Sequence, residues 1–340
     1  MDSPTSLLGR SVPLDDAQLL RNALAVPVME WAEWSDGLDR ALSWMETLHR
    51  QIALGRDVHA SMEALHRGLV LLRRKWDREE WRRFCLEGAR QHPLLKVLHT
   101  CPFTRHGFER PRGYAGDAGL IDYLYTEHDG EDLSFPGQLV YRFMYEQPSP
   151  RSVRERRRIL ARALDSVATR VKDARVLSVA CGHLREAESS RAVAEHRLGE
   201  FIAFDQDEVS LAEVKRQHPT GPVQTVQGSV RSLLQGKTTF SDMDLVYSAG
   251  LYDYLAEASA RRLTRHLFDM LRPGGRLILA NFAHCPEMGY MEAFMDWWLV
   301  YRDEAQMLGM LRGIPPEELA SQQLFRDSEN CVIYLVLTRR

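Results

Sequence analysis

The sequence lacks a long hydrophobic run. No stretch of about 18 apolar residues occurs, so no membrane-spanning helix is predicted. Residues 1–16 have no basic segment followed by an apolar one, and we therefore expect no secretory signal peptide. The formal net charge is only −3 over 340 residues. A charge this small gives no general electrostatic reason to bind nucleic acid or an anionic membrane, and we expect neither as a partner.

Cysteine is scarce, and its spacing is irregular. The five cysteines form no C-x-x-C pair, and an odd number of dispersed thiols is more typical of a reducing cytoplasm than of a disulfide framework. The twelve histidines include no H-E-x-x-H motif, and none pairs with a cysteine at zinc-site spacing. We therefore expect no metal site, and we expect a cytoplasmic location.

The composition is that of an ordinary globular protein, with 44% hydrophobic and 27% charged residues. Between residues 15 and 100, Leu, Ala, Met and Trp recur at three- and four-residue spacing, which predicts amphipathic helices. Residues 99–119 and 126–138 are rich in turn-forming residues, so neither is expected to form one regular element. We predict an α-helical N-terminal cap or lid region over residues 1–135 and a second domain over residues 136–340.

The second domain begins with a helical pattern at residues 152–171, whose basic first half we interpret as a solvated helix face. From residue 174, β-rich runs alternate with helical segments, which predicts an α/β fold with a doubly wound parallel sheet that binds ligands at the carboxyl ends of its strands. The last two strands flank the short turn DSEN and predict an antiparallel hairpin. The strands are expected at 175–180, 201–204, 223–226, 244–248, 276–282, 322–326 and 331–338, and the helices between them at about 186–196, 208–217 and 256–271.

The first strand of this domain ends in VLSVACGHLRE, residues 176–186, which carries a single glycine, Gly182. Phosphate-binding loops at such a junction carry two or three glycines, so the absence of G-x-G-x-x-G disfavours a dinucleotide-dependent dehydrogenase. Asp205 ends the second strand 23 residues after Gly182. A carboxylate there can accept hydrogen bonds from both hydroxyls of a ribose, and a helix N-cap is the alternative. Asp207 is interpreted as a first-turn helix residue.

These segments together resemble the class I S-adenosylmethionine (SAM) methyltransferases, which have a Rossmann-like seven-stranded sheet with a C-terminal antiparallel hairpin. VLSVACGHLRE is similar to their first SAM motif, with His183 and Leu184 where the family more often has further glycines. DLVYSAGLYDYL (244–255) and LRPGGRLILANF (271–282) match the regions of the fourth and fifth strands. The resemblance implies SAM as cofactor. The residues expected to bind it are Ala180, Gly182, Asp205, Gln206, Ser229, Val230 and Ser248.

Three further segments resemble a bacterial subgroup with a helical N-terminal region: GYAGD (113–117), YSAGLYDYL (247–255) and YMEAFMDWWLVYR (290–302). That subgroup includes enzymes that methylate 3-hydroxy fatty acids and enzymes that cyclise SAM to azetidine-2-carboxylate. The resemblance covers about residues 100–340. If GYAGD folds over the cofactor as a lid, Arg112 would hold the carboxylate of SAM and Asp117 its α-amine. Ordinary turn residues are the alternative.

Aromatic side chains dominate the rest of the predicted site, and their faces attract a sulfonium as they attract other soft cations. The candidate catalytic residues are Tyr114, Tyr252 and Asn281. The candidate substrate-binding residues are Tyr254, Phe282, Trp297 and Tyr301, of which the last two are predicted to share one helix face with core packing as the alternative. His183 and His284 have no visible partner in the sequence and are interpreted as turn histidines.

The chemistry stays open between two reactions. Methyl transfer to a carboxylic acid or a related small metabolite needs no base, because a carboxylate is already ionised near neutral pH. Intramolecular cyclisation of SAM needs a neutral α-amine, which a desolvated pocket favours. A SAM-binding protein without chemistry is a third hypothesis. Nucleic-acid methylation is disfavoured because SAGLYDY lacks an Asn/Asp-Pro-Pro-Tyr motif. A homodimer is kept as a hypothesis.

Overall fold

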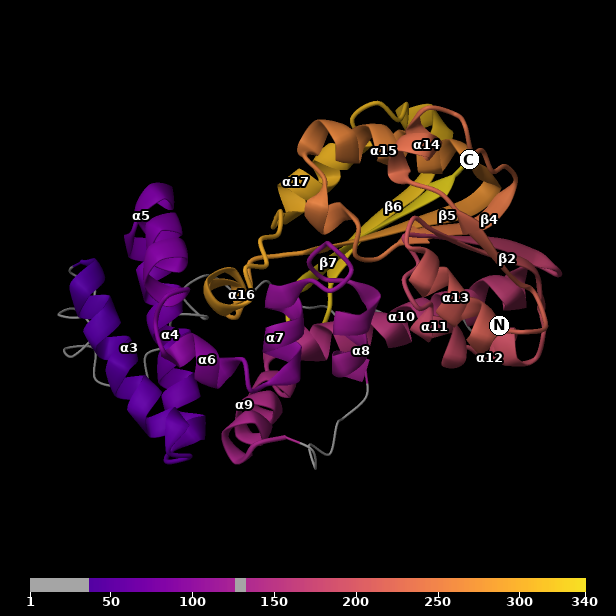
Figure 1. The fold of residues 1–340 in the computed structure, drawn as a ribbon. Coiled ribbons are helices and arrows are strands. Elements are labelled where there is room, and N and C mark those ends of the chain that lie inside the picture. The colour runs from indigo at the N-terminus through magenta and orange to yellow at the C-terminus, as the bar shows by residue number, and fades with distance from the viewer. Residues whose placement is uncertain (1–36, 126–132) are drawn as a thin grey trace, which may run out of the picture.

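The computed structural model describes residues 37–125 and 133–340 (Figure 1). Its centre is a seven-stranded sheet with the strand order β3-β2-β1-β4-β5-β7-β6. Strands β1 to β5 pair in parallel, whereas β7 pairs antiparallel with both β5 and β6. The predicted α/β fold with a C-terminal antiparallel hairpin is therefore confirmed. The strands are β1 Ala174–Val179, β2 Leu198–Asp205, β3 Val223–Gln227, β4 Met243–Ser248, β5 Leu271–Phe282, β6 Leu319–Arg326 and β7 Val332–Arg339.

Helices cover both faces of the sheet because successive side chains of each buried strand point to opposite faces. Val176 and Tyr247 belong to one apolar cluster with α10, α12 and α13, whereas Leu177 and Val246 belong to a second cluster with α14, α15 and α17. The helices of this part are α10 Pro148–Arg170, α11 Arg185–Glu188, α12 Arg191–Ala194, α13 Glu208–Gln217, α14 Val230–Leu234, α15 Glu257–Asp269, α16 Met288–Phe294 and α17 Glu304–Leu308, with short 3₁₀ turns at Tyr252–Tyr254, Gly309–Leu311 and Pro316–Glu318.

The N-terminal part is helical, as predicted, over the residues that the structure describes; the predicted helical segment before residue 37 lies outside them. Helix α16 lies between the N-terminal helices and the sheet (Figure 1). Its Glu292 forms an ion pair with Arg73 at 2.6 Å and accepts a hydrogen bond from the indole of Trp81. The helices are α3 Leu38–Ala53, α4 Val58–Lys75, α5 Arg78–Arg83, a π-helical segment Phe84–Ala89, α6 Leu94–Leu98, α7 Pro102–Glu109, α8 Ala118–Tyr125 and α9 Phe135–Tyr145. The division at residue 135 stays a prediction, and α9 begins at that residue. None of the described helices is long and apolar enough to cross a membrane.

Two predicted helices differ from the structure. The single helix expected at 186–196 is two short helices, α11 and α12, separated by Ser189 and Ser190, the second of which caps α12 through its side chain. The helix expected to carry Trp297 and Tyr301 is wrong, because α16 ends at Phe294 and the chain then runs irregularly to residue 303. Asp296 adopts a left-handed backbone with φ of 46°, which ends the helical path there.

Candidate functional site

A cavity of about 610 Å³ lies at the carboxyl ends of the central strands. Its floor consists of residues that follow β1, β2, β3 and β4, and its roof consists of residues from α8, α10 and the loop before α8. This is the place where doubly wound sheets bind their ligands. Of the sequence-predicted site residues, the cavity is lined by Tyr114, Ala180, Gly182, Asp205, Gln206, Val230 and Tyr254.

The turn from β1 into α11 has an alternating left-handed backbone. Ala180, Gly182 and Leu184 have φ values of 56°, 55° and 53°. Glycine adopts such a conformation readily, whereas other residues do so at a cost of about 1–2 kcal/mol each. The turn therefore has three glycine-type conformations with only one glycine, which explains why the motif is weak in the sequence although its backbone is tightly wound.

Asp205 is fastened to this turn at the cavity wall. One oxygen of its carboxylate accepts the backbone N–H of Gly182 at 2.8 Å, and the other accepts the backbone N–H of Asp207 at 2.9 Å. Burial raises the pKa of Asp205, although the two N–H donors oppose the shift. Each oxygen keeps a lone pair for a further donor, so the carboxylate fits a ribose diol. Asp207 caps α13 by accepting the N–H of Val209, as its interpretation as a helix-start residue implied.

The loop before α8 folds over the cavity. Arg112 donates to the carboxylate of Asp207 and to the hydroxyl of Ser210, both at 2.8 Å, and the hydroxyl of Tyr114 donates to Asp207 at 3.2 Å. The loop of residues 110–117, which we call the lid loop, is thus joined to the start of α13. The guanidinium of Arg112 makes these contacts and does not line the cavity. Its predicted contact with the carboxylate of SAM therefore stays a prediction without support from the cavity lining.

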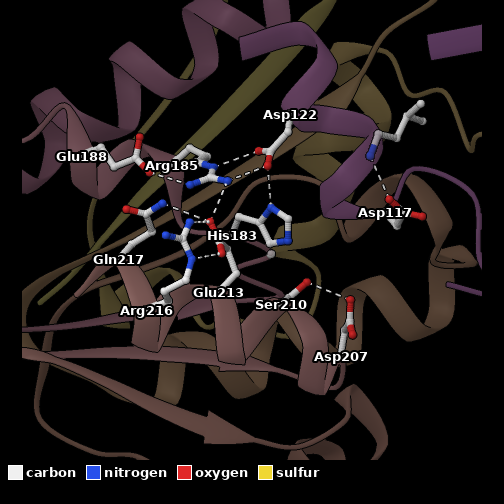
Figure 2. A network of polar contacts seen from close by, with 12 residues as sticks. Asp117, Asp122, His183, Arg185, Glu188, Asp207, Ser210, Glu213, Arg216 and Gln217 are labelled. Carbon is white, nitrogen blue, oxygen red and sulfur yellow. Dashed lines mark hydrogen bonds and ion pairs between the residues drawn. The ribbon is translucent and has the colours of Figure 1, made fainter. Parts of the chain in front are cut away.

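A charged network continues from the lid loop to the β1–α11 turn (Figure 2). His183 contacts Asp122 of α8 through Nδ1 at 2.8 Å, and its Nε2 accepts from Arg112 at 3.0 Å. Because an arginine is only a donor, the proton of the neutral ring lies on Nδ1. Arg185 makes two further bonds to Asp122 and reaches Glu213 on α13. His183 does lie in a turn, as interpreted, but it has two side-chain partners that the sequence did not reveal.

Asp117 also differs from its predicted role. It is 1% exposed, its carboxylate contacts Nε2 of His106 at 2.8 Å, and it accepts the backbone N–H of Leu120 at the start of α8. The side chain anchors the helix and lies outside the cavity lining. The structure therefore does not place it where the α-amine of SAM was expected.

Several predicted residues are parts of the core beside the site. Tyr252 is fully buried with its hydroxyl 3.0 Å from that of Thr264, and Asn281 donates to the backbone oxygens of Phe282 and Val300. Ser248 donates to the backbone of Val179. None of these side chains lines the cavity. Ser248 and Asn281 lie at the carboxyl ends of β4 and β5, and Tyr252 follows β4, but each side chain points to the packed interior, where its polar atom has a partner.

Most of the remaining predicted residues lie outside the cavity lining. The indole of Trp297 donates to the hydroxyl of Tyr254 at 2.7 Å, and this brings Tyr254 to the cavity mouth. Tyr301 and Phe282 lie outside the lining, and the exposed His284 meets the Tyr301 ring edge-on. Ser229 caps α14 by accepting the N–H of Ser232.

The cavity is also lined by polar residues that the sequence pattern did not reveal, among them Arg156, Glu186 and Tyr247. The carboxylate of Glu186 accepts the hydroxyl of Tyr247 at 2.6 Å, and burial raises its pKa. Arg156 on α10 is 7% exposed. The expectation that the basic run of α10 is a solvated face is therefore wrong at this position. A signal was present, because Arg156 stands three residues after Val153 and four before Leu160, on the apolar stripe of the helix.

No group of three or more His, Cys, Asp or Glu side chains that could hold a metal ion occurs within residues 37–125 and 133–340. The donor set at the cavity instead fits a nucleoside with a charged tail, since the Asp205 carboxylate faces it beside a left-handed glycine turn. Gly182, Asp205 and Val230, which were predicted to bind SAM after the first, second and third strands, all line this cavity.

Comparison with known proteins agrees with this reading of the fold. Residues 176–275 match the family described as "Methyltransferase domain". No curated protein matches the sequence. Among solved structures, a possible exported protein from Bordetella parapertussis is similar with a TM-score of 0.58 and 19% identity, over 78% of this chain and 98% of that chain.

Two methyltransferases are similar over the sheet domain at lower scores. The N-methyltransferase NodS from Bradyrhizobium japonicum WM9, in complex with S-adenosylhomocysteine, has a TM-score of 0.39 and 14% identity over 54% of this chain and 86% of its own. Magnesium protoporphyrin IX methyltransferase from Synechocystis has a TM-score of 0.42 and 14% identity over 56% and 87%. Residues 176–275 thus match a methyltransferase domain, which supports SAM as the methyl donor, and the sheet has the C-terminal antiparallel hairpin expected from the sequence.

Proposed function

We propose that the protein transfers the methyl group of SAM to a small carboxylic acid or a related small metabolite. The observation that carries this proposal is the cavity that joins the Gly182–Asp205 turn to the aromatic side chains of Tyr114, Tyr254 and Trp298. A volume of about 610 Å³ lies within the range of small-molecule sites. The lid loop covers the cavity, which suits a small acceptor better than a polymer.

The chain's own residues supply position and exclusion of water. When bound, SAM supplies a methyl group on a sulfonium. A carboxylate oxygen forms a bond to the methyl carbon and the bond from that carbon to sulfur breaks, which leaves a neutral ester and a neutral thioether. Asp205 holds the ribose, and the aromatic rings face the sulfonium, each contributing about 0.5–2 kcal/mol. The lid loop, fastened by Arg112 to Asp207, keeps water from the reacting atoms. Both ring nitrogens of His183 already have partners, so this histidine is not available to remove a proton from the acceptor. A carboxylate needs no such base, because it is already ionised near neutral pH.

The test is to incubate the purified protein with SAM and a set of acids (octanoate, 3-hydroxyoctanoate and benzoate) and to follow products by mass spectrometry. We expect S-adenosylhomocysteine and a methyl ester in equal amounts. The variant Asp205→Asn should reduce both products together, with Asp39→Asn on the exposed surface of α3 as the matched control. S-adenosylhomocysteine that forms at the same rate without any acid would count against a carboxylic acid acceptor.

Cyclisation of SAM to azetidine-2-carboxylate is a second candidate, favoured by Glu186. This buried carboxylate lines the cavity, and its raised pKa makes it a better proton acceptor than an ordinary glutamate. In that reaction the α-amine forms a bond to the γ-carbon, the C–S bond breaks, and a proton leaves the nitrogen for Glu186. Incubation with SAM alone would then yield methylthioadenosine, and Glu186→Gln would abolish it. Intact SAM after long incubation would exclude this reaction.

A further inference from the structure

Arg156 occupies a position where the helix pattern calls for an apolar residue. The buried face of α10 runs through Val153, Arg156, Leu160, Leu164 and Val167 at spacings of three and four residues. Every other member of this stripe is an aliphatic core residue. Burying a guanidinium among them is costly unless a partner compensates its charge, so a charged residue here calls for an explanation by binding.

The protein itself supplies Arg156 with no full counter-charge. Its side chain hydrogen-bonds Tyr125, and among the described residues it forms no ion pair with a carboxylate. Burial by itself lowers the pKa of Arg156, and the nearby Tyr125, Tyr334 and Asp253 more than offset that effect, so the guanidinium stays charged. The Glu186 carboxylate also lines the cavity and is close enough for Arg156 to lower its pKa, but its hydrogen bond is with Tyr247 and it forms no ion pair with Arg156. A cation is thus left facing the cavity.

The sheet order places this cation away from the nucleoside end. Asp205 ends β2 and Gly182 follows β1, whereas the charged neighbours of Arg156 include Asp253, which follows β4, and Tyr334 on β7. A side chain added at Gly250, directly after β4, would meet Nη1 of Arg156 at 3.9 Å. The cavity therefore has the Asp205 carboxylate at its β1–β2 side and the Arg156 guanidinium near the end of β4, and Gly250 and residues of the lid loop line it as well.

We propose that Arg156 binds the carboxylate of the methyl acceptor, which makes the substrate class a monocarboxylic acid. This inference rests on the proposed function. Arginine presents paired N–H donors that match both oxygens of a carboxylate. Methylation of one oxygen turns the anion into a neutral ester, which forms no ion pair with the guanidinium. The same residue then selects the acid and releases the product.

The methionine end of SAM also carries a carboxylate, which Arg156 could bind instead. The experiment therefore distinguishes binding of the SAM carboxylate from binding of the acceptor carboxylate. Affinities of S-adenosylhomocysteine and of methylthioadenosine, which lacks the amino-acid end, are measured by titration calorimetry on the wild type, Arg156→Met and Arg156→Lys. Octanoate, 3-hydroxyoctanoate, benzoate and octanol are then titrated into each protein saturated with S-adenosylhomocysteine. Arg158→Met, on the exposed face of the same helix, is the matched control.

We expect Arg156→Met to weaken binding of the acids by about 30-fold or more and to leave both nucleosides and octanol unchanged, because a buried charge loses its partner. Arg156→Lys should restore part of the affinity. A loss of S-adenosylhomocysteine affinity with unchanged methylthioadenosine affinity would assign Arg156 to the cofactor and overturn the proposal. So would a wild-type protein that binds none of the acids.

Failure of the proposed function is distinguishable from failure of this inference. Acids that bind through Arg156 but are never methylated would contradict the function and leave the carboxylate subsite standing. Methyl esters that form equally well with Arg156→Met, at unchanged KM for the acid, would leave the function standing and overturn the subsite. Thermal unfolding of each variant reports whether the fold is retained.

Discussion

The backbone N–H of Gly182 donates to the carboxylate of Asp205 across 2.8 Å. This bond joins the turn after β1 to the end of β2, and it aims the carboxylate at the cavity. The two residues are therefore one structural unit, and their bond fixes the direction of the carboxylate that we propose to bind the ribose. Preorganised contacts of this kind favour binding because little ordering is needed when the ligand arrives.

The first prediction concerns this unit. Asp205→Asn removes the charge but keeps one oxygen acceptor, and we expect SAM affinity to fall roughly 10- to 100-fold because hydrogen bonds to a charged acceptor are the stronger ones. Titration calorimetry with SAM measures the effect. Asp39→Asn should bind SAM like the wild type. An unchanged affinity in Asp205→Asn would show that the ribose is held elsewhere.

A second prediction follows from the left-handed backbone of Ala180. The residue is exposed and has φ of 56°, so Ala180→Gly should remove local strain at little cost in packing. We expect the free energy of unfolding to rise by about 0.5–1 kcal/mol in urea titrations. The same substitution within α10, Ala163→Gly, should destabilise by about 1 kcal/mol. A loss of stability in Ala180→Gly would argue against strain at that residue.

The lid loop is the subject of a third prediction. Arg112 joins it to Asp207, Ser210 and His183, so Arg112→Met should release residues 110–117 from α13. We expect faster amide hydrogen exchange in that loop and faster dissociation of SAM, while the sheet stays protected. Arg78→Met, on the surface of α5, serves as the control. Equal exchange in both variants would contradict the role of Arg112 as a fastening residue.

The fourth prediction concerns pH. Burial raises the pKa of Asp253 from 3.8 to about 7, although Arg156 and Arg302 oppose the shift. In that pH interval the folded state keeps a proton that the unfolded state releases, so the contribution of Asp253 to stability is full below pH 3.8 and is lost as the pH rises through about 7. Urea unfolding between these pH values should show stability falling in the wild type.

Asp253→Asn tests the origin of that slope. Asparagine keeps an oxygen to accept the N–H of Phe282, so the fold should survive while the titrating proton is gone. We expect a shallower decline of stability with pH. The decline should not vanish, because burial also raises the pKa of Glu287 to about 7. Identical slopes in wild type and Asp253→Asn would show that Asp253 titrates as an ordinary carboxylate.

The local sequence pattern was enough to predict the sheet and to indicate that Gly182 and Asp205 lie together at the cavity. The alternation of β-rich and helical segments after residue 174 predicts the seven strands and the closing hairpin, because the side-chain periods of strands and helices are local properties of the chain. Gly182 and Asp205 were found by spacing, since both stand at the ends of adjacent parallel strands. Their bond to each other follows from the register of β1 and β2.

The direction of individual side chains could not be predicted in the same way. Tyr252 follows β4 and Asn281 lies at the end of β5, as expected, yet their polar atoms bond to the core, because Thr264 and the backbone of Val300 pack there. His183 gained Asp122 and Arg112 as partners from a segment more than 60 residues earlier in the chain. Such partners depend on which distant elements meet.

The sequence by itself determined the order of strands and helices, the turn at Gly182 and the acidic end of β2, because these depend on periodicity and spacing over short stretches. Only the tertiary structure decided that Arg156 faces the cavity, that Arg112 fastens the lid loop and that Asp117 anchors α8 instead of touching a ligand. Burial of a charged side chain without a full counter-charge favours a bound ligand of opposite charge, and such burial depends on contacts between elements far apart in the chain.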